Sequence, residues 1–201
     1  MSTVTEPKQD RSRATRLRIL EAAVESLASR GWEASSVAVI AADAGTSRGA
    51  LQHHFPTRED LIVAALDHMF ERRSELVEAM TVPDLTGAER VAHVLHTIVE
   101  VYLGPLFEAA LQVWTAAAAD ETLRQRIVPL ERRFGGGVHE MTVRLLGVDD
   151  SDPHVRTLVQ ATLDMVRGLA LAAVLTDDSR RRGRVVDAWA EQLARGLGLA
   201  E

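Results

Sequence analysis

The chain has 201 residues, of which 46% are hydrophobic, 4% are aromatic and none is cysteine. This composition favours closely packed helices over a sheet, and because apolar and polar residues do not alternate we expect an all-α protein. The lack of cysteine excludes disulfides, cysteine-based zinc sites and thiol redox chemistry, and no apolar run has the roughly eighteen residues of a membrane span, so we expect a cytoplasmic protein.

The net charge of −6 is unevenly distributed along the chain. Residues 1–60 carry eight basic and eight acidic side chains, so the whole acidic surplus falls on residues 61–201. Between residues 8 and 18, five basic side chains accompany a single acidic one. We expect Arg13 and Arg16 of this segment to reach nucleic-acid phosphate, because affinity depends on the charges near the contact surface and not on the net charge.

The first elements are a tail and a helix. Residues 1–11 are polar and contain Pro7, so we expect a disordered tail. Leu17, Leu20, Val24 and Leu27 then recur at helical spacing. This pattern predicts a first helix from residue 12 to residue 30, which Gly31 ends. Trp32 is expected to pack beneath the elements that follow.

Residues 36–55, SVAVIAADAGTSRGALQHHF, predict two short helices joined by a tight turn. Gly45 provides the positive φ of the turn, and Thr46 or Ser47 caps the second helix. Ala50 and Leu51 are expected to face inward. The outward face then carries Arg48, Gly49, Gln52 and His53.

The outward face suits double-stranded DNA. A helix of about seven residues is roughly 10 Å long and fits a major groove about 12 Å wide. Arg48 can donate twice to guanine, or it can remain on a phosphate or in solvent. Gln52 can read adenine, bind water or make no contact. We expect His53 to meet a phosphate, and we include Thr46 and Ser47 in the same surface.

Residues 18–66 resemble the N-terminal DNA-binding domain of the TetR/AcrR family of transcriptional regulators. The resemblance rests on the IL-AA of the first helix, the Gly31-aromatic step, the SV-x-x-IA-x-x-AG turn, the HHF ending and a basic residue before an acidic-x-Leu helix start. It implies phosphate contacts at Ser35, Ser36 and Arg58, the last standing where the family usually has lysine. Beyond this segment the resemblance covers only length and helical character.

The predicted organisation is an N-terminal three-helix helix-turn-helix DNA-binding domain, residues 1–57, and a larger helical ligand-binding and dimerisation domain, residues 58–201, with about nine helices in all. The later helices are expected at 57–80, 88–103, 105–119, 121–146, 151–175 and 181–197. Pro129 is expected to kink the helix at 121–146, and the glycines at 135–137 either split it or leave room for a neighbour or ligand.

The resemblance also implies a partner and a ligand. The last two helices are apolar over faces too wide for one neighbour. In the family these helices pair with a second subunit as a four-helix bundle, which here assigns the dimer interface to Leu158, Thr162, Leu169, Val186, Trp189 and Leu193. The family's inducer pocket corresponds to Thr97, Phe107, Trp114, Met141 and Met165, for each of which a pure core role is the alternative.

Metal binding and catalysis have little support in the residues. His93, His96 and Glu100 share one helix face, where they would either hold a divalent metal or form a polar strip. No further ligand lies nearby, so we expect no metal and no cofactor. No glycine-rich phosphate loop follows a strand and no nucleophile elbow occurs, so we do not expect an enzyme.

These observations predict a homodimeric, sequence-specific DNA-binding regulator, most simply a repressor that a small-molecule ligand releases from a palindromic operator. Two alternatives remain open at this stage. One is a constitutive DNA-binding protein without an inducer, and the other is a helical small-molecule-binding protein that keeps the N-terminal domain only as a scaffold.

Overall fold

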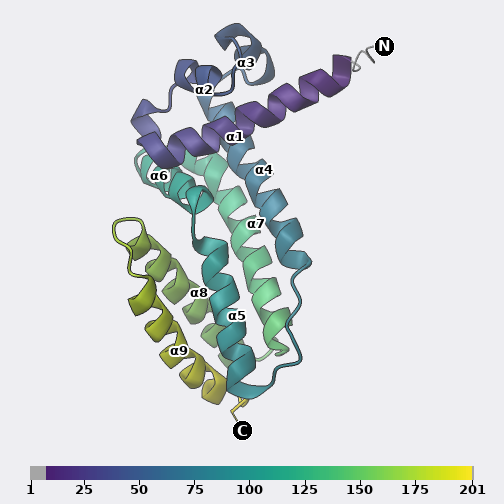
Figure 1. The fold of residues 1–201 in the computed structure, drawn as a ribbon, viewed down its shortest axis with the longest axis vertical. Helices are drawn as coiled ribbons and strands as arrows, with labels where there is room; N and C mark the ends of the chain where they lie inside the picture. The colour runs from purple at the N-terminus through teal and green to yellow at the C-terminus, as the bar shows by residue number, and fades with distance from the viewer. Residues whose placement is uncertain (1–7, 201) are drawn as a thin grey trace, which may run out of the picture. The chain divides into compact units, whose positions relative to one another are not determined.

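The computed structural model describes residues 8–200, and within that range the chain forms nine helices and no strand (Figure 1). The helices are α1 (Lys8–Ala34), α2 (Val37–Asp43), α3 (Arg48–His54), α4 (Arg58–Glu78), α5 (Gly87–Tyr102), α6 (Pro105–Ala119), α7 (Glu121–Leu146), α8 (Pro153–Ala173) and α9 (Ser179–Gly196). The predicted all-α class is confirmed.

Two compact units divide the described chain. The first unit contains the described part of residues 1–71 together with residues 105–130, and the second contains residues 72–104 together with the described part of residues 131–201. Helices α4 and α7 each contribute to both units. These units group residues by packing, so the functional division at residue 57 stays a prediction.

In the first unit, α1 is the central element, and α2, α3 and α6 pack against it. Its buried side chains recur at helical spacing: Ile19, Leu20, Ala23, Val24 and Leu27. Gly31 interrupts α1 with a φ of 79°, a conformation that glycine adopts without a Cβ clash. The chain therefore changes direction at Gly31, and the following short turn ends at Ala34.

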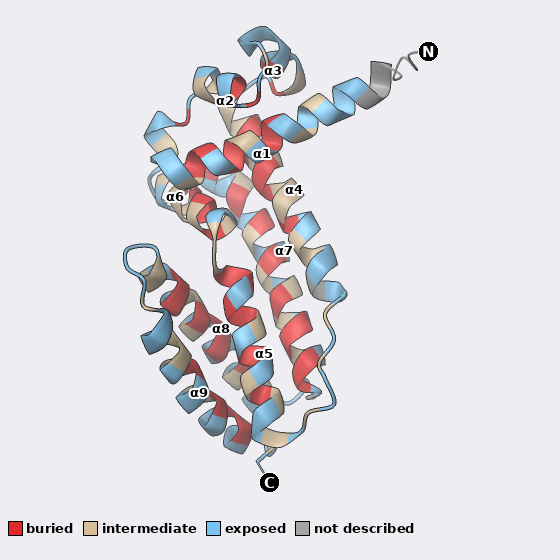
Figure 2. Cartoon of the chain, viewed as in Figure 1, coloured by how far each residue is buried: buried red, intermediate tan, exposed pale blue. Residues whose placement is uncertain are grey.

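In the second unit, α5 packs against α8 and α9, and α8 packs against α9. Each helix buries one stripe of residues spaced by three or four positions. Fully buried members of these stripes are Val91, Val94, Leu95, Ile98, Val159, Val166, Val186 and Leu193. Figure 2 shows the buried stripes running along the three helices.

The predicted tail differs from the structure, whereas the helix predicted at 121–146 has the bounds of α7. The predicted tail included residues 8–11, but these residues already belong to α1, while residues 1–7 lie outside the described range. Helix α7 continues through Pro129 and residues 135–137 without being split. A Cβ atom on Gly136 or Gly137 would meet no atom within 4 Å, so no close neighbour requires glycine at these two positions.

The continuity of α7 follows from its buried stripe. Leu123, Ile127, Leu130, Phe134, Val138, Met141 and Leu145 are all buried and keep helical spacing on both sides of the glycines. Tertiary packing of this stripe stabilises the helix although glycine and proline disfavour it locally.

No single helix within residues 8–200 has the length and apolar composition to cross a membrane. Among the described helices, one bent pair, α5 with α6, reaches that length and composition when taken together across the break between them.

Candidate nucleic-acid interface

Helices α2 and α3 form a helix-turn-helix whose helix starts are fixed by side-chain caps. The hydroxyls of Ser36 and Ser47 each accept a hydrogen bond from the backbone N–H three residues later, at 3.3 and 3.1 Å. Gly45, with a φ of 62°, turns the chain between the helices. Of the two residues expected to cap α3, it is Ser47 and not Thr46 that does so.

The inward faces of the two helices are small and apolar. Ile40 and Ala41 of α2 and Leu51 of α3 are buried. Ala50 is exposed, so the prediction that it faces inward is wrong. Leu51 is the buried residue of the seven-residue α3, and adjacent residues on a helix point in different directions, so Ala50 does not share its buried side.

The outward face of α3 and the turn before it carry the residues predicted to meet DNA (Figure 2): Ser47, Arg48, Gly49, Gln52 and His53, which are exposed, and Thr46, which is half-buried. Arg48 and Gln52 form no hydrogen bond or ion pair within residues 8–200. Their donors therefore remain available, and Arg48 stands in the first turn, where a bidentate contact to guanine is geometrically favoured. Base contact by these residues stays a prediction.

Arg13 and Arg16 are exposed on the N-terminal half of α1. The guanidinium of Arg16 lies 5.3 Å from the ring centroid of Phe55, the residue that ends α3. Such a cation–π contact at an exposed site contributes about 0.5–1 kcal/mol. It joins the basic segment of α1 to the end of the recognition helix, and the phosphate contacts predicted for both arginines stay predictions.

Ser35 does not belong to this surface. Its side chain is fully buried, and its hydroxyl accepts a hydrogen bond from Ser26 at 3.0 Å and donates one to the carbonyl of Gly31 at 2.8 Å. The prediction that Ser35 contacts a phosphate is therefore wrong, because its hydroxyl is enclosed and already bonded. Ser36 is exposed at the start of α2, where its predicted phosphate contact remains possible to test.

Arg58 is engaged with the chain's own backbone. Its Nε donates to the carbonyl of Ser35 at 3.0 Å, its second nitrogen donates to the carbonyl of Trp32, and the guanidinium lies 4.1 Å from the centroid of the Trp32 ring. Arg58 thus links the start of α4 to the segment between α1 and α2. Its predicted phosphate contact stays a prediction.

The five residues predicted to line an inducer pocket fall in both units. Phe107 and Trp114 of α6 meet edge to face, with ring centroids 5.9 Å apart. In the second unit, the Thr97 hydroxyl donates to a backbone carbonyl one turn earlier, and Met141 is buried. Met165 lies at a groove between α8 and α9. The recorded ring contact joins Phe107 and Trp114, and the ligand role of all five residues stays a prediction.

Two buried polar groups lie on α4 and α5, and the one on α4 was not identified from the sequence. The Nε2 atom of His68 on α4 is buried and has no hydrogen-bond partner among the described residues. Buried polar atoms in folded proteins normally have a hydrogen-bond partner, so His68 is a candidate position for a bound water or ligand. In the second unit, burial raises the pKa of the Tyr102 phenol, and the guanidinium of Arg167 lies 5.7 Å from its ring centroid. A polar residue within the apolar stretch 61–70 was the available sequence signal for His68.

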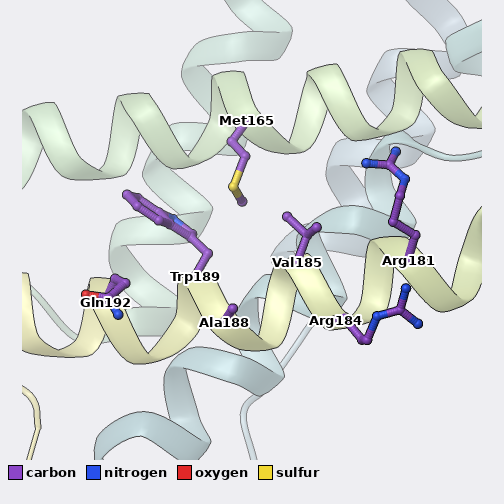
Figure 3. Close-up of a pocket in the computed structure, with 7 residues that line it drawn as sticks. All are labelled: Met165, Arg181, Arg184, Val185, Ala188, Trp189 and Gln192. Carbon is purple, nitrogen blue, oxygen red and sulfur yellow. The ribbon is translucent and has the colours of Figure 1, made fainter.

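Helices α8 and α9 carry a second set of apolar residues outside their buried stripes. These residues line an open groove with a volume of about 420 Å³. Figure 3 shows Met165 of α8 pointing toward α9, while Val185 and Trp189 of α9 point toward α8. Arg181 and Arg184 lie at one end of the groove.

The predicted dimer residues divide between the protein core and this groove. Four of them are buried within a single chain: Thr162, Leu169, Val186 and Leu193. Their prediction as contacts to a second subunit is wrong, because they pack in the core of the second unit. Leu158 and Trp189 are partly exposed, and they remain candidates for such contacts.

The polar strip on α5 contributes a contact to a neighbouring helix. The Nε2 atom of His96 lies 2.8 Å from a carboxylate oxygen of Asp187 on α9. No three metal-binding side chains gather closely enough to hold an ion anywhere in residues 8–200. The strip consists of His93, His96 and Glu100, and its member His96 links α5 to α9.

Comparisons with known proteins agree with the helix-turn-helix geometry. Residues 19–65 match the family described as bacterial regulatory proteins, tetR family. The chain is 27% identical over 188 residues to the HTH-type transcriptional regulator CymR of Pseudomonas putida, covering 92% of each protein.

Two solved structures extend the comparison to most of the fold. A TetR-family transcriptional regulator from Mesorhizobium loti superposes with a TM-score of 0.71 at 17% identity, covering 93% of this chain and 96% of its own. The multidrug binding protein EbrR, complexed with proflavin, gives a TM-score of 0.58 at 25% identity, covering 89% of this chain and 99% of its own. The first of these likenesses concerns the fold alone.

Proposed function

We propose, since this chain belongs to the TetR family of transcriptional regulators, that it acts as a homodimer that represses transcription from a palindromic operator until a small molecule releases it. Membership in the family makes it a DNA-binding regulator. The dimer, the repression and the release are the steps that we add.

The observation that carries the proposal is the outward face of α3. This helix is capped by Ser47, held from inside by Leu51 and free on the side that carries Arg48 and Gln52. Two or three base-reading side chains specify too few base pairs to select one genomic site. Two copies related by a twofold axis read a palindrome and double the number of base pairs that are specified.

The groove between α8 and α9 supports a second copy of the chain as the partner. Its apolar floor at Met165, Val185 and Ala188 and the adjacent Trp189 would otherwise remain in contact with water. Exposed large apolar side chains continue at the end of α8, where Leu171 is 50% exposed and Leu175, just beyond the helix, is 87% exposed. Large contiguous apolar surfaces on a folded chain mark interaction sites.

Two observations support a small-molecule ligand. EbrR binds proflavin, a planar molecule, on a similar fold. In the present chain the partly exposed Trp114, which packs against the buried Phe107, offers aromatic surface, and His68 offers a buried nitrogen without a hydrogen-bond partner in the described chain. A ligand that prefers the DNA-incompetent state by about 1–3 kcal/mol would weaken operator binding about 5- to 150-fold.

The activity is therefore binding and not catalysis, as in the relatives, which are transcriptional regulators. Because its partner is genomic DNA, we assign the protein to the cytoplasm.

The test is a compound screen on the operator that the wild-type protein selects from random DNA. Compounds that bind are titrated against the protein–DNA complex, and we expect at least one to release the operator. The variants His68→Ala and Trp114→Phe should weaken such a compound while leaving operator affinity without compound unchanged, and Thr115→Ala, on the exposed side of α6, serves as the control. Operator affinity that no bound compound alters would contradict the release mechanism.

A further inference from the structure

Helix α6 and the first part of α7 pack with the helix-turn-helix in one compact unit. Helix α6 lies along α1, on which α2 and α3 also pack. The sequence assigned residues 105–130 to the larger C-terminal domain. Their packing gives them direct contacts with the elements that hold the recognition helix.

The first contact is made by Gln112 of α6 at the break in α1. Its Oε1 atom accepts a hydrogen bond from the backbone N–H of Trp32 at 3.4 Å. A Cβ atom added to Gly31 would lie 3.2 Å from the same oxygen, which is closer than ordinary van der Waals contact. The side chain of Gln112 therefore packs closely against the backbone at Gly31. Gln112 therefore touches the point at which the chain leaves α1 for α2.

Trp32 is also held by Arg58, as described above, through its carbonyl and its ring. The Nε atom of Arg58 also donates a hydrogen bond to the backbone carbonyl of Ser35 at 3.0 Å. The segment before α2 is thus held between α6 and the start of α4. A shift of α6 relative to α4 must strain one of these hydrogen bonds.

The second contact is made by Arg126 of α7 at the start of α4. A terminal nitrogen of Arg126 lies 2.8 Å from one carboxylate oxygen of Asp60. The other carboxylate oxygen accepts from the N–H of Thr57 at 3.1 Å, while the Thr57 hydroxyl accepts from the N–H of Asp60 at 3.0 Å. This reciprocal pair is the capping box of α4, two residues after Phe55 ends α3.

The hydrogen bond from the Thr57 hydroxyl and then that from Arg126 lower the pKa of Asp60. The carboxylate is therefore ionised at neutral pH and able to pair with Arg126. Both side chains are about one-third exposed, at 36% for Arg126 and 35% for Asp60. Either side chain can therefore be substituted without creating a cavity in the core.

We infer that Gln112 and Arg126 are positioning residues for DNA recognition, which act through Trp32 and Asp60 and do not touch DNA. This inference rests on the proposed function and deepens it, since it identifies where movement of α6 or α7 would reach the helix-turn-helix. Both residues lie outside the helix-turn-helix, and neither belongs to a sequence motif that would have identified it.

The closing experiment measures affinity for the selected operator as a function of salt for the wild type, Arg126→Gln, Asp60→Asn and the double variant. We expect each single variant to bind at least about fivefold more weakly. The double variant should be no weaker than the weaker single variant, because both changes break one interaction. The slope of log affinity against log salt should stay at the wild-type value, because no phosphate contact is lost.

Arg124→Gln is the matched control, since Arg124 lies on the same helix and pairs with Glu121 of that helix. It should leave operator affinity unchanged, and Arg126→Lys, which keeps a charge near Asp60, should recover part of the loss. A salt slope that falls by about one in Arg126→Gln would indicate a direct phosphate contact. That result, or additive losses in the double variant, would overturn the role of Arg126.

Gln112 is tested without DNA, so the result is independent of operator binding. In Gln112→Ala we expect faster amide hydrogen exchange in the peptide spanning residues 31–36 than in the wild type. Thr115→Ala, whose hydroxyl bonds only within α6 at 2.9 Å, should leave that peptide unchanged. Wild-type exchange in Gln112→Ala would overturn the role of Gln112, whereas failure of the wild type to select DNA would count against the proposed function instead.

Discussion

Helices α3 and α9 are both amphipathic, but they differ in how many apolar sides they present. Helix α3 has seven residues and buries one side chain, Leu51. Helix α9 has eighteen residues, buries Val186 and Leu193 on one side, and directs Val185 and Trp189 into the groove on another. In a short helix with one large apolar residue, that residue and the cap define the buried side. In a long helix with two apolar sides, the packing of neighbouring helices determines which side is buried.

This difference has a functional meaning. The free side of α3 is polar and ready for DNA, while the groove side of α9 is apolar and suits a second copy of the chain. Substitutions in either helix test this assignment of roles, and they follow in order of decreasing expected effect.

The largest effect is expected for Leu193→Ala. Leu193 is 0% exposed, so the truncation leaves a cavity in the second unit and should lower the free energy of unfolding by about 2–5 kcal/mol. Denaturant unfolding at several protein concentrations measures this loss and separates it from dimer dissociation. Glu191→Ala, at an exposed position of α9 outside the groove, is the control. A dimer weakened without loss of protomer stability would place Leu193 at the subunit interface after all.

The next effect concerns the groove. Val185→Glu introduces a charge beside Met165 and Trp189, and we expect it to weaken the dimer by about 2 kcal/mol or more, roughly 30-fold in Kd. Sedimentation velocity over a concentration series measures the change. Gln160→Glu adds the same charge at an exposed position of α8 outside the groove and should leave the dimer intact. Equal dissociation in both variants would reject the groove as the interface.

On α3, Arg48→Ala should cost about 1–3 kcal/mol of operator binding and relax the preference at one base pair of each half-site. The measurement is affinity for the selected operator and its single-base variants. Ala50→Ser, at an exposed position of the same helix, should change neither quantity appreciably. A uniform loss over all DNA sequences would instead place Arg48 on a phosphate.

The smallest effect is expected for Ser47→Ala, which removes the cap of α3. Loss of an N-cap hydroxyl costs about 1 kcal/mol of stability, and denaturant unfolding would detect it. Thr46→Ala should have less effect, since Thr46 does not cap the helix. The reverse order would show that Thr46 caps α3 when the protein is in solution.

Much of the helix-turn-helix could be predicted because its signals are local. Gly45 turns the chain and Ser47 caps α3, both of which depend only on neighbouring residues. The burial of Ser35 could not be predicted, because its hydroxyl is bonded to Ser26, and a buried serine and an exposed one look the same in a sequence. Ala50 was misassigned because alanine fits either face of a short helix.

The candidate ligand and dimer sites were less predictable for a related reason. Met165 was expected in an inducer pocket, and the groove that it lines is completed by Val185 and Trp189 from the next helix. Val186 was expected at the dimer interface, but it packs inside the second unit. Adjacent residues on one helix differ in role, and only the packing of α5, α8 and α9 against one another distinguishes them.

The most direct test of the account is selection of DNA bound by the wild-type protein from a random pool, with Arg48→Ala selected in parallel. We predict that the wild type enriches an inverted repeat whose half-sites are separated by about one or more helical turns. Arg48→Ala should retain the spacing but lose preference at one symmetry-related pair of positions. Enrichment of a single asymmetric site, or of no sequence at all, would contradict recognition of DNA by two copies of α3.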